Sequence, residues 1–389
     1  LRATKIANGV EAPGTGSKDG KEYALRVAEF AAYAPADTFD PGRVIYVRAG
    51  GEVYTPAGIA ALHDNSDKTY AAEQAINGMY YENLDRIGYA VPESFGLKNF
   101  KNTADIEINI LRWWYHRIIR SSGVSADGTE LYLDSDWLTS FQHSSYADRI
   151  TWLENAYEFI DQPGEWYLDR RESKIYYKPD GTMNGKTAVL PVTEQLLVFE
   201  GSENITFDGV KFENTSWLTP NEIGYNDAQS GTFVQHNGIW GDVPGAIETH
   251  AAKNITITNS ELCNLGGGGI RIGNGSSDCS ITNSAIHDIS SSGIWIGNNT
   301  GHNHGSCEPG TDVTGIVVRN NYVTRTGLDI FDASAICALY TSNTVIDHNE
   351  VCNTSYTGIS LGWGWDWKNA PCSGNNTVSN NYVHDTGKT

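Results

Sequence analysis

The sequence lacks a long apolar run. No stretch approaches the roughly 18 residues that cross a bilayer, so neither a transmembrane helix nor a membrane partner is predicted. Basic charge is also scarce, with 27 Lys and Arg against 47 Asp and Glu and a formal net charge of −20. Nucleic acids and anionic surfaces bind to basic footprints, so nucleic acid is not an expected partner. The same acidity favours neutral sugars over anionic polymers as ligands.

Cysteine is scarce and unevenly distributed. Because no Cys-x-x-Cys pair occurs, we expect no zinc site and predict disulfides instead, with their pairing left open. No cofactor is predicted. A Ca²⁺ site is kept as an alternative for the Gly-rich loop that holds His302, His304, Glu308 and Asp312, although the ligand spacing there is irregular. The six cysteines, all in the second half of the chain, are Cys263, Cys279, Cys307, Cys337, Cys352 and Cys372.

Seven Asn-x-Ser/Thr sites predict a secreted, extracellular glycoprotein. Such sites are glycosylated only in chains that pass through a secretory pathway. The first four residues lack an apolar signal core, which we interpret as a signal already removed. The predicted acceptors are Asn204, Asn214, Asn254, Asn274, Asn298, Asn353 and Asn375.

A repeat runs through the second half of the chain. Five segments share a β-branched start, a polar step and a turn Asn, and the chain contains 41 Gly, as expected of many short strands and turns. The steps between the turn residues are 24, 37, 29 and 31 residues, which suits a solenoid with variable loops better than a propeller. These turn residues are Asn259, Asn283, Asn320, Asn349 and Asn380.

A second strand lies between successive copies of the repeat. Each copy alternates apolar and polar residues with period two, so one side points inward and the other outward. The predicted inward stack is Ile247, Ile270, Ile294, Ile336 and Ile359. The predicted outward column is Glu248, Arg271, Trp295, Cys337 and Ser360.

The predicted fold is therefore all-β, a right-handed parallel β-helix over residues 196–389. Residues 1–195 differ and are predicted to form an N-terminal cap or β-rich insertion that leads into the solenoid. Within them, residues 24–34 predict a short helix, and residues 106–120 with 130–133 predict strands. A cap is expected because an open solenoid end leaves unpaired backbone groups.

Several segments resemble a group of right-handed parallel β-helix carbohydrate-active enzymes. They are residues 152–179, 204–212, 287–294 and 356–365, and the resemblance covers about residues 105–389. The group includes β-xylosidases, lacto-N-biosidases, α-fucosidases and xylanases. The resemblance implies an oligo- or polysaccharide substrate without defining the sugar.

The resemblance also implies one further coil. In similar proteins the coil after the equivalent of Lys388 carries an Asp-Gly-Gly-Gly-Ile-Tyr type strand with a functional Asp. That coil is missing from these 389 residues, so we expect it from a cleaved part of the same chain or from a second polypeptide.

Glycoside hydrolysis needs two carboxyl groups across the scissile bond. Asp332 is the first candidate, because it lies four residues before Ile336, where similar proteins carry the Asp of the next coil. Asp329, three residues before Asp332, is a further candidate. Asp385 lies in the turn before the expected coil, with His384 beside it, although the equivalent turn residue Asp288 indicates that this position also serves structure. Each of these aspartates can alternatively be a turn-capping residue.

Predicted substrate-binding residues follow from aromatic and polar side chains near the predicted groove. Tryptophan faces suit the apolar faces of sugar rings, and a carboxylate can orient hydroxyls. A solvated strand face or a covered coil end would show the same pattern. The candidates are Trp363, Trp365, Asp366, Glu248, Arg271, Trp295 and His384.

The favoured hypothesis is an extracellular glycoside hydrolase. A polysaccharide lyase or epimerase on the same fold is one alternative. Such an enzyme requires cations to neutralise a uronate. Few basic residues lie on this face, and they are Arg271 and Arg319. A non-catalytic glycan-binding solenoid is the other alternative. Two carboxylates that converge in one groove would distinguish the enzyme from the binding module.

Overall fold

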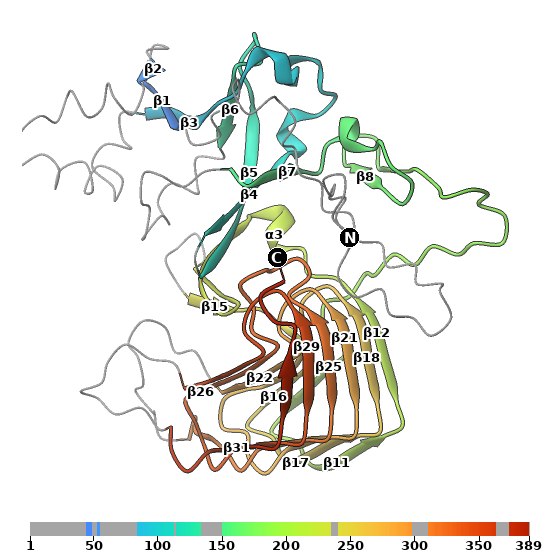
Figure 1. The fold of residues 1–389 in the computed structure, drawn as a ribbon, viewed down its shortest axis with the longest axis vertical. Helices are drawn as coiled ribbons and strands as arrows, with labels where there is room; N and C mark the ends of the chain where they lie inside the picture. The colour runs from blue at the N-terminus through green and yellow to red at the C-terminus, as the bar shows by residue number, and fades with distance from the viewer. Residues whose placement is uncertain are drawn as a thin grey trace, which may run out of the picture.

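The computed structural model describes residues 44–48, 53–54, 84–112, 114–133, 150–234, 240–297, 310–362 and 373–388. Its C-terminal half is a parallel β-helix of three sheets, in which each coil contributes one strand to each sheet. In Figure 1 the stacked coils form the lower part of the molecule and an N-terminal module the upper part.

Each of the three sheets has six strands in strict sequence order. The first sheet consists of β10 (Leu197–Glu200), β16 (Gly245–His250), β19 (Gly268–Ile272), β22 (Ile294–Gly297), β26 (Ile336–Leu339) and β30 (Ile359–Leu361). The second sheet consists of β11 (Glu203–Asp208), β17 (Lys253–Thr258), β20 (Ser280–Thr282), β24 (Val317–Arg319), β28 (Val345–Asp347) and β31 (Thr377–Ser379). The third sheet consists of β12 (Lys211–Thr215), β18 (Glu261–Leu265), β21 (Ala285–Ile289), β25 (Tyr322–Thr326), β29 (Glu350–Thr354) and β32 (Tyr382–His384).

The core of the β-helix is an aliphatic stack. Ile247, Ile270, Ile294, Ile336 and Ile359 pair in register through the first sheet, as the alternating pattern predicted. The first four are buried in the apolar core, and Ile359 packs against it at the last coil. Parallel strands joined by short turns place equivalent residues at the inter-strand spacing of about 4.8 Å, so one apolar position per coil builds a continuous core.

One turn position of the predicted repeat is wrong by one residue. Asn259, Asn283, Asn320 and Asn380 have left-handed backbones, with φ between 51° and 54°, but in the fourth coil His348, not Asn349, has this conformation. The register explains the shift, because Arg319 pairs with Asp347 and Asp347 with Ser379. The steps are therefore 24, 37, 28 and 32 residues.

Asn349 belongs instead to a buried ladder one residue further on. The side-chain oxygen of Asn349 accepts hydrogen bonds from the backbone and side-chain N–H groups of Asn321, both at 3.0 Å. The Asn349 amide in turn donates to the side chain of Asn381 at 2.9 Å. This ladder satisfies polar groups inside the corner between the second and third sheets.

The N-terminal module is a mixed β structure. The strands predicted over residues 106–120 and 130–133 are confirmed as β4 (Glu107–Arg112), β5 (Tyr115–Val124) and β6 (Glu130–Leu133). They join β1 (Val44–Arg48), β2 (Val53–Tyr54), β3 (Leu84–Ala90) and β7 (Trp152–Glu154) in one sheet, and β8 (Trp166–Asp169) pairs with β9 (Lys174–Tyr177) as a separate hairpin. The helix predicted at residues 24–34 lies outside the described residues.

Short elements complete the description. Turns of 3-10 helix lie at Glu93–Phe95, Leu97–Asn99, Thr103–Asp105 and Tyr157–Phe159, and α3 spans Thr219–Glu222. Between the first and second sheets, β23 (Val313–Thr314) pairs with β27 (Thr341–Ser342). No helix in the described part of the chain is long and apolar enough to span a bilayer.

A long excursion of the first coil joins the module to the β-helix. β13 (Tyr225–Gln229), β14 (Thr232–Val234) and β15 (Trp240–Asp242) extend the sheet of the module, with Tyr225 opposite Ile118 of β5. Ile118 packs in one buried cluster with Trp217, Tyr225, Val243, Ile330 and Ala333. The module therefore contacts the β-helix through an apolar junction.

The prediction of disulfides is wrong for the four described cysteines. Cys263, Cys279, Cys337 and Cys352 are all buried and free, while Cys307 and Cys372 lie outside the described residues. Cys263 and Cys352 share one column of the third sheet but are three strands apart, a distance of about 14 Å. A disulfide requires Cα atoms about 4.4–6.8 Å apart.

Candidate functional site

The outward column of the first sheet is in the predicted register. Glu248 lies beside Arg271, Arg271 beside Trp295, Trp295 beside Cys337 and Cys337 beside Ser360. These side chains are not open to solvent, since Glu248 and Trp295 are each 5% exposed and Cys337 is fully buried. The excursion that carries β15 covers the column, because Asp242 of β15 contacts Arg271.

Arg271 is the centre of a charged network at the start of this column. Its guanidinium binds the carboxylates of Asp242 and Glu248. Burial opposes the Arg271 charge, but the two carboxylates outweigh it and raise the pKa of Arg271. Glu248 also accepts from Gln195 at 2.7 Å and lies 3.1 Å from His250 Nε2. Because the Arg271 charge is neutralised by two acids, it is not available to neutralise a uronate as a lyase requires.

Asp332 lies at the junction between the module and the first sheet. It is 1% exposed, and its carboxyl accepts from the Tyr225 hydroxyl and from the Gly231 backbone N–H, both at 3.3 Å. Phe331 beside it donates its backbone N–H to Nδ1 of His116, a fully buried residue of β5. The loop before β26 is thus held by residues from two separate parts of the chain.

Asp329 and Asp385 are placed apart from each other. The Asp329 carboxylate accepts from the Ser290 hydroxyl on the preceding coil. Asp385 is half exposed and lies 2.8 Å from His384 Nδ1 and 3.0 Å from Lys388 Nζ. The hydrogen bond from His384 and the charge of Lys388 lower the pKa of Asp385, so its carboxyl is ionised at neutral pH.

The corner of Asp385 repeats that of Asp288. Four residues are equivalent by register, and all of them have positive φ: Asp288 in β21, Arg325 in β25, Asn353 in β29 and Asp385 directly after β32. Asp288 also follows a histidine and lies 2.8 Å from that ring. The sequence already shows this His-Asp pair twice, and in both coils Nδ1 of the histidine lies 2.8 Å from the carboxylate of the following aspartate.

The last coil presents an apolar end. A hollow there is lined by Tyr356, Ile359, Val378 and Val383, and it adjoins Thr386 next to Asp385. Val378 and Val383 are more than 40% exposed. The inward face of the solenoid is therefore open to solvent at this end of the described chain.

Other predicted residues lie outside the described part. These are Trp363, Trp365 and Asp366, the ligands His302, His304 and Glu308 of the alternative cation loop, and the acceptor Asn298. Five described acceptors have positive φ: Asn204, Asn214, Asn254, Asn353 and Asn375. The Asn254 amide nitrogen donates to Asn204 at 2.8 Å, so these two form a corner ladder. Glycosylation stays a prediction.

A second group of polar side chains was not singled out by sequence reasoning. Glu261, Cys263 and His287 meet on the outward face of the third sheet, and Glu350, Cys352 and His384 do so again. The signal was present as Glu-Leu-Cys-Asn at 261–264 and Glu-Val-Cys-Asn at 350–353, each followed one coil later by His-Asp. A search for paired Cys-x-x-Cys misses it, because its ligands come from adjacent strands.

The sheets and the junction define a right-handed parallel β-helix with an attached β-rich module. A family model described as a right handed beta helix region matches residues 245–389, and one described as a GH141 insertion domain matches residues 82–180. The predicted fold class is confirmed, and so is the similarity to β-helix glycoside hydrolases.

Solved structures show the same similarity. One described as a glycoside hydrolase has 23% sequence identity and a TM-score of 0.70, over 78% of this chain and 58% of its own. This chain thus spans 58% of the length of that protein. A second, described as the complex structure of XylC with xylose, has 12% identity and a TM-score of 0.29, over 66% of this chain and 36% of its own, which is too low for any inference. A comparison with curated proteins returns no match.

Proposed function

We propose that this protein is an extracellular glycoside hydrolase that cleaves an oligo- or polysaccharide at the face of the first sheet. The observation that carries the proposal is the buried Asp332 carboxyl, which lies where the module meets this sheet. The match of the module to a GH141 insertion domain supports the same reaction class. The seven sequons support the extracellular location.

Asp332 would supply one of the two carboxyl groups that hydrolysis requires. Asp329 and Asp385 are the candidates for the second. The low pKa of Asp385 suits a nucleophile or a base, because these roles need an ionised carboxylate, and it does not suit a general acid. Trp295 and the Arg271 network are covered by the excursion and would stabilise the face of the first sheet from beneath it.

We further propose that additional coils, from the same polypeptide or from a second one, cover the apolar end near Val378 and Val383. Large apolar side chains at more than 40% exposure are costly in water, and a stacked coil would bury them. Such a coil would lie beside Asp385 and could contribute its own carboxylate.

The test is Asp332→Asn in the intact protein, assayed on a panel of neutral aryl glycosides that includes xylosides and fucosides. We expect turnover to fall by about 100-fold or more, because an amide can neither donate a proton as the acid nor act as the base. Asn is close in size to Asp, so the fold should be retained, and circular dichroism checks this.

Asp208→Asn is the matched control. Asp208 is an exposed aspartate of the second sheet whose carboxylate binds a corner Asn, and its variant should keep full turnover. Separate Asp329→Asn and Asp385→Asn variants identify the second carboxyl. Unchanged turnover in Asp332→Asn would refute the assignment, and an intact protein that binds oligosaccharides but hydrolyses none would favour the glycan-binding alternative.

A further inference from the structure

The outward column of the third sheet concentrates metal-binding side chains. Its register places Glu213, Cys263, His287, Thr324, Cys352 and His384 in one line. Their neighbours Leu262, Ile286, Val323 and Val351 belong to the inward core, so the column points away from it. Cys and His on adjacent parallel strands lie about 4.8 Å apart at the backbone, within reach of a shared ion.

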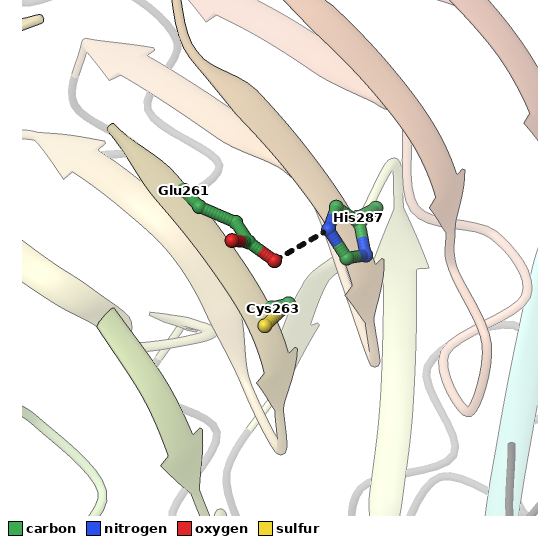
Figure 2. A group of neighbouring side chains, drawn as sticks. All are labelled: Glu261, Cys263 and His287. Atoms are coloured by element: carbon green, nitrogen blue, oxygen red, sulfur yellow. Dashed lines mark hydrogen bonds and ion pairs between the residues drawn. The ribbon is translucent and has the colours of Figure 1, made fainter. Parts of the chain in front are cut away.

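Glu261, Cys263 and His287 converge at one point of this column (Figure 2). Glu261 and Cys263 are two residues apart on β18, so they share a face, and His287 comes from β21. One ligand atom from each lies within 4.8 Å of the others, and Glu261 Oε1 is 3.3 Å from His287 Nε2. Cys263 is 2% exposed, so its thiol is enclosed.

His287 is oriented by a carboxylate on its other nitrogen. Nδ1 lies 2.8 Å from Asp288 Oδ2, and Asp288 is bound in turn by Arg325, whose Nε donates to it at 2.7 Å. Because Arg325 donates to the Asp288 carboxylate, this carboxylate is the acceptor toward the imidazole and Nδ1 is the donor. The 3.4 Å contact from Arg325 to Nδ1 is then not a hydrogen bond. A carboxylate on the far nitrogen is the usual support of a metal-binding histidine.

This orientation aims Nε2 at two other electron-rich groups. In the Nδ1–H tautomer Nε2 carries a lone pair, and it faces the Glu261 carboxylate, which only accepts, and the Cys263 sulfur. Three lone-pair donors at such close range repel one another unless a proton or a metal ion lies between them. A metal ion at this point would bind all three groups at once.

A nucleophilic role for Cys263 fits the structure less well. Cys263, His287 and Asp288 have the residue types of a Cys-His-Asp triad, but Cys263 is only 2% exposed, so a substrate cannot reach its thiol. A nucleophilic cysteine needs a partly exposed position.

The same arrangement recurs three coils later. Glu350 and Cys352 of β29 and His384 of β32 also bring their ligand atoms within 4.8 Å of one another. His384 Nδ1 lies 2.8 Å from Asp385, and Nε2 is buried without a hydrogen-bond partner while it points toward Glu350 at 3.5 Å. The recurrence of the three ligands and of the orienting carboxylate argues against a chance grouping.

We propose that Glu261, Cys263 and His287 form a binding site for a divalent transition-metal ion of the Zn²⁺ type, and that Glu350, Cys352 and His384 form a second. Sulfur, imidazole and carboxylate together suit Zn²⁺, whereas Ca²⁺ and Mg²⁺ take oxygen ligands. At the first site Glu213, whose Oε2 is 3.9 Å from Cys263 Sγ, is placed to complete four ligands. Each ion would clamp two successive coils together.

The two sites differ in two neighbours on the preceding strand. Beside the first site are Lys211 and Glu213, and the equivalent positions beside the second site hold Tyr322 and Thr324. Lys211 lies 3.0 Å from Glu213 and 3.5 Å from Glu261, so its amine must move aside when a metal binds at the first site.

The experiment uses Co²⁺ as a spectroscopic probe. The intact, reduced protein is treated with a chelator, freed of it, and titrated with Co²⁺. We expect two equivalents to bind with a thiolate-to-cobalt charge-transfer band. Cys263→Ala and Cys352→Ala should each lose one equivalent and about half of the band, and the double variant should lose all of it. His287→Gln, which keeps every cysteine, should lose the first equivalent.

Cys279→Ala is the matched control, because Cys279 is also buried and free but lies in the apolar core. It should bind both equivalents. The proposal is overturned if the wild type shows no thiolate band with stoichiometric Co²⁺, if the double cysteine variant keeps it, or if Cys279→Ala loses as much as Cys263→Ala. A band lost entirely in Cys263→Ala and untouched in Cys352→Ala supports the first site and overturns the second.

Discussion

Lys101 and Asp169 form an ion pair in the N-terminal module. Lys101 Nζ lies 2.7 Å from Asp169 Oδ2, and the Asp169 side chain is 1% exposed. The other Asp169 oxygen accepts the backbone N–H groups of Arg171 and Glu172. The hydrogen bond with Lys101, followed by that with the Glu172 backbone, lowers the pKa of Asp169 to about 2.

The low pKa of Asp169 predicts that the free energy of unfolding decreases in acid. The folded pKa of Asp169 is below the unfolded value of about 3.9, so its contribution is complete above about pH 4 and is lost as the pH falls toward 2. The gap in free energy of unfolding between the wild type and Asp169→Asn should be constant at neutral pH and shrink over this range. Urea unfolding at several pH values measures it.

Lys101→Met serves as the control for this prediction. Lys101 is the largest cause of the low pKa of Asp169, so its removal should raise that pKa. The pH range over which the free energy of unfolding decreases should then become narrower. A gap between wild type and Asp169→Asn that stays constant down to pH 2 would show that Asp169 does not titrate below its unfolded value.

Among the elements, the corner between the second and third sheets depends on hydrogen bonds rather than apolar contacts. Asn321 and Asn349 are 3% and 1% exposed. The side-chain oxygen of Asn349 accepts hydrogen bonds from the backbone and side-chain N–H groups of Asn321. Its side-chain amide donates to the Val318 carbonyl and to Asn381. A corner residue in this position therefore closes one coil onto the next.

Asn349→Ala should destabilise the protein by about 2–3 kcal/mol, because it leaves buried N–H groups of Asn321 without an acceptor. Asn259→Ala, at an exposed corner with φ 51°, should cost only about 1 kcal/mol, from left-handed strain and one lost surface bond. Chemical denaturation compares the two. Equal costs would contradict a special role for the buried ladder.

At the scale of the whole molecule, the module and the β-helix are joined by one buried contact region. Ile118 of β5 is fully buried against Tyr225, Ile330 and Ala333, next to Asp332. The loop that holds the candidate carboxyl is thus positioned by packing between parts of the chain that lie more than 100 residues apart.

Ile118→Ala should loosen this junction, at a cost of about 2–5 kcal/mol for the lost buried side chain. Hydrogen exchange should rise at residues 225–234 and 330–333 and stay low in β22, whose Ile294 is held by the aliphatic stack. Hydrogen–deuterium exchange with mass spectrometry measures this. Equal acceleration in β22 would show that the module and the β-helix unfold as one unit.

The sequence by itself determined the coils. Period-two alternation and the recurring Asn turns predicted the fold, the inward isoleucine stack and the outward column, because in a parallel stack each local pattern is repeated at the same place in every coil. The one-residue error at Asn349 arose because two neighbouring corner positions both favour Asn, one for its backbone and one for its amide.

Only the tertiary structure decided which side chains meet. The cover over Arg271 and Trp295, the contacts of Asp332 with Tyr225 and Gly231, and the junction through Ile118 come from an excursion and a module that no repeat predicts. The Glu261, Cys263 and His287 group needs the register between two strands, since a step of one residue would turn Cys263 inward. Contacts between distant segments depend on packing, and local sequence patterns do not encode packing.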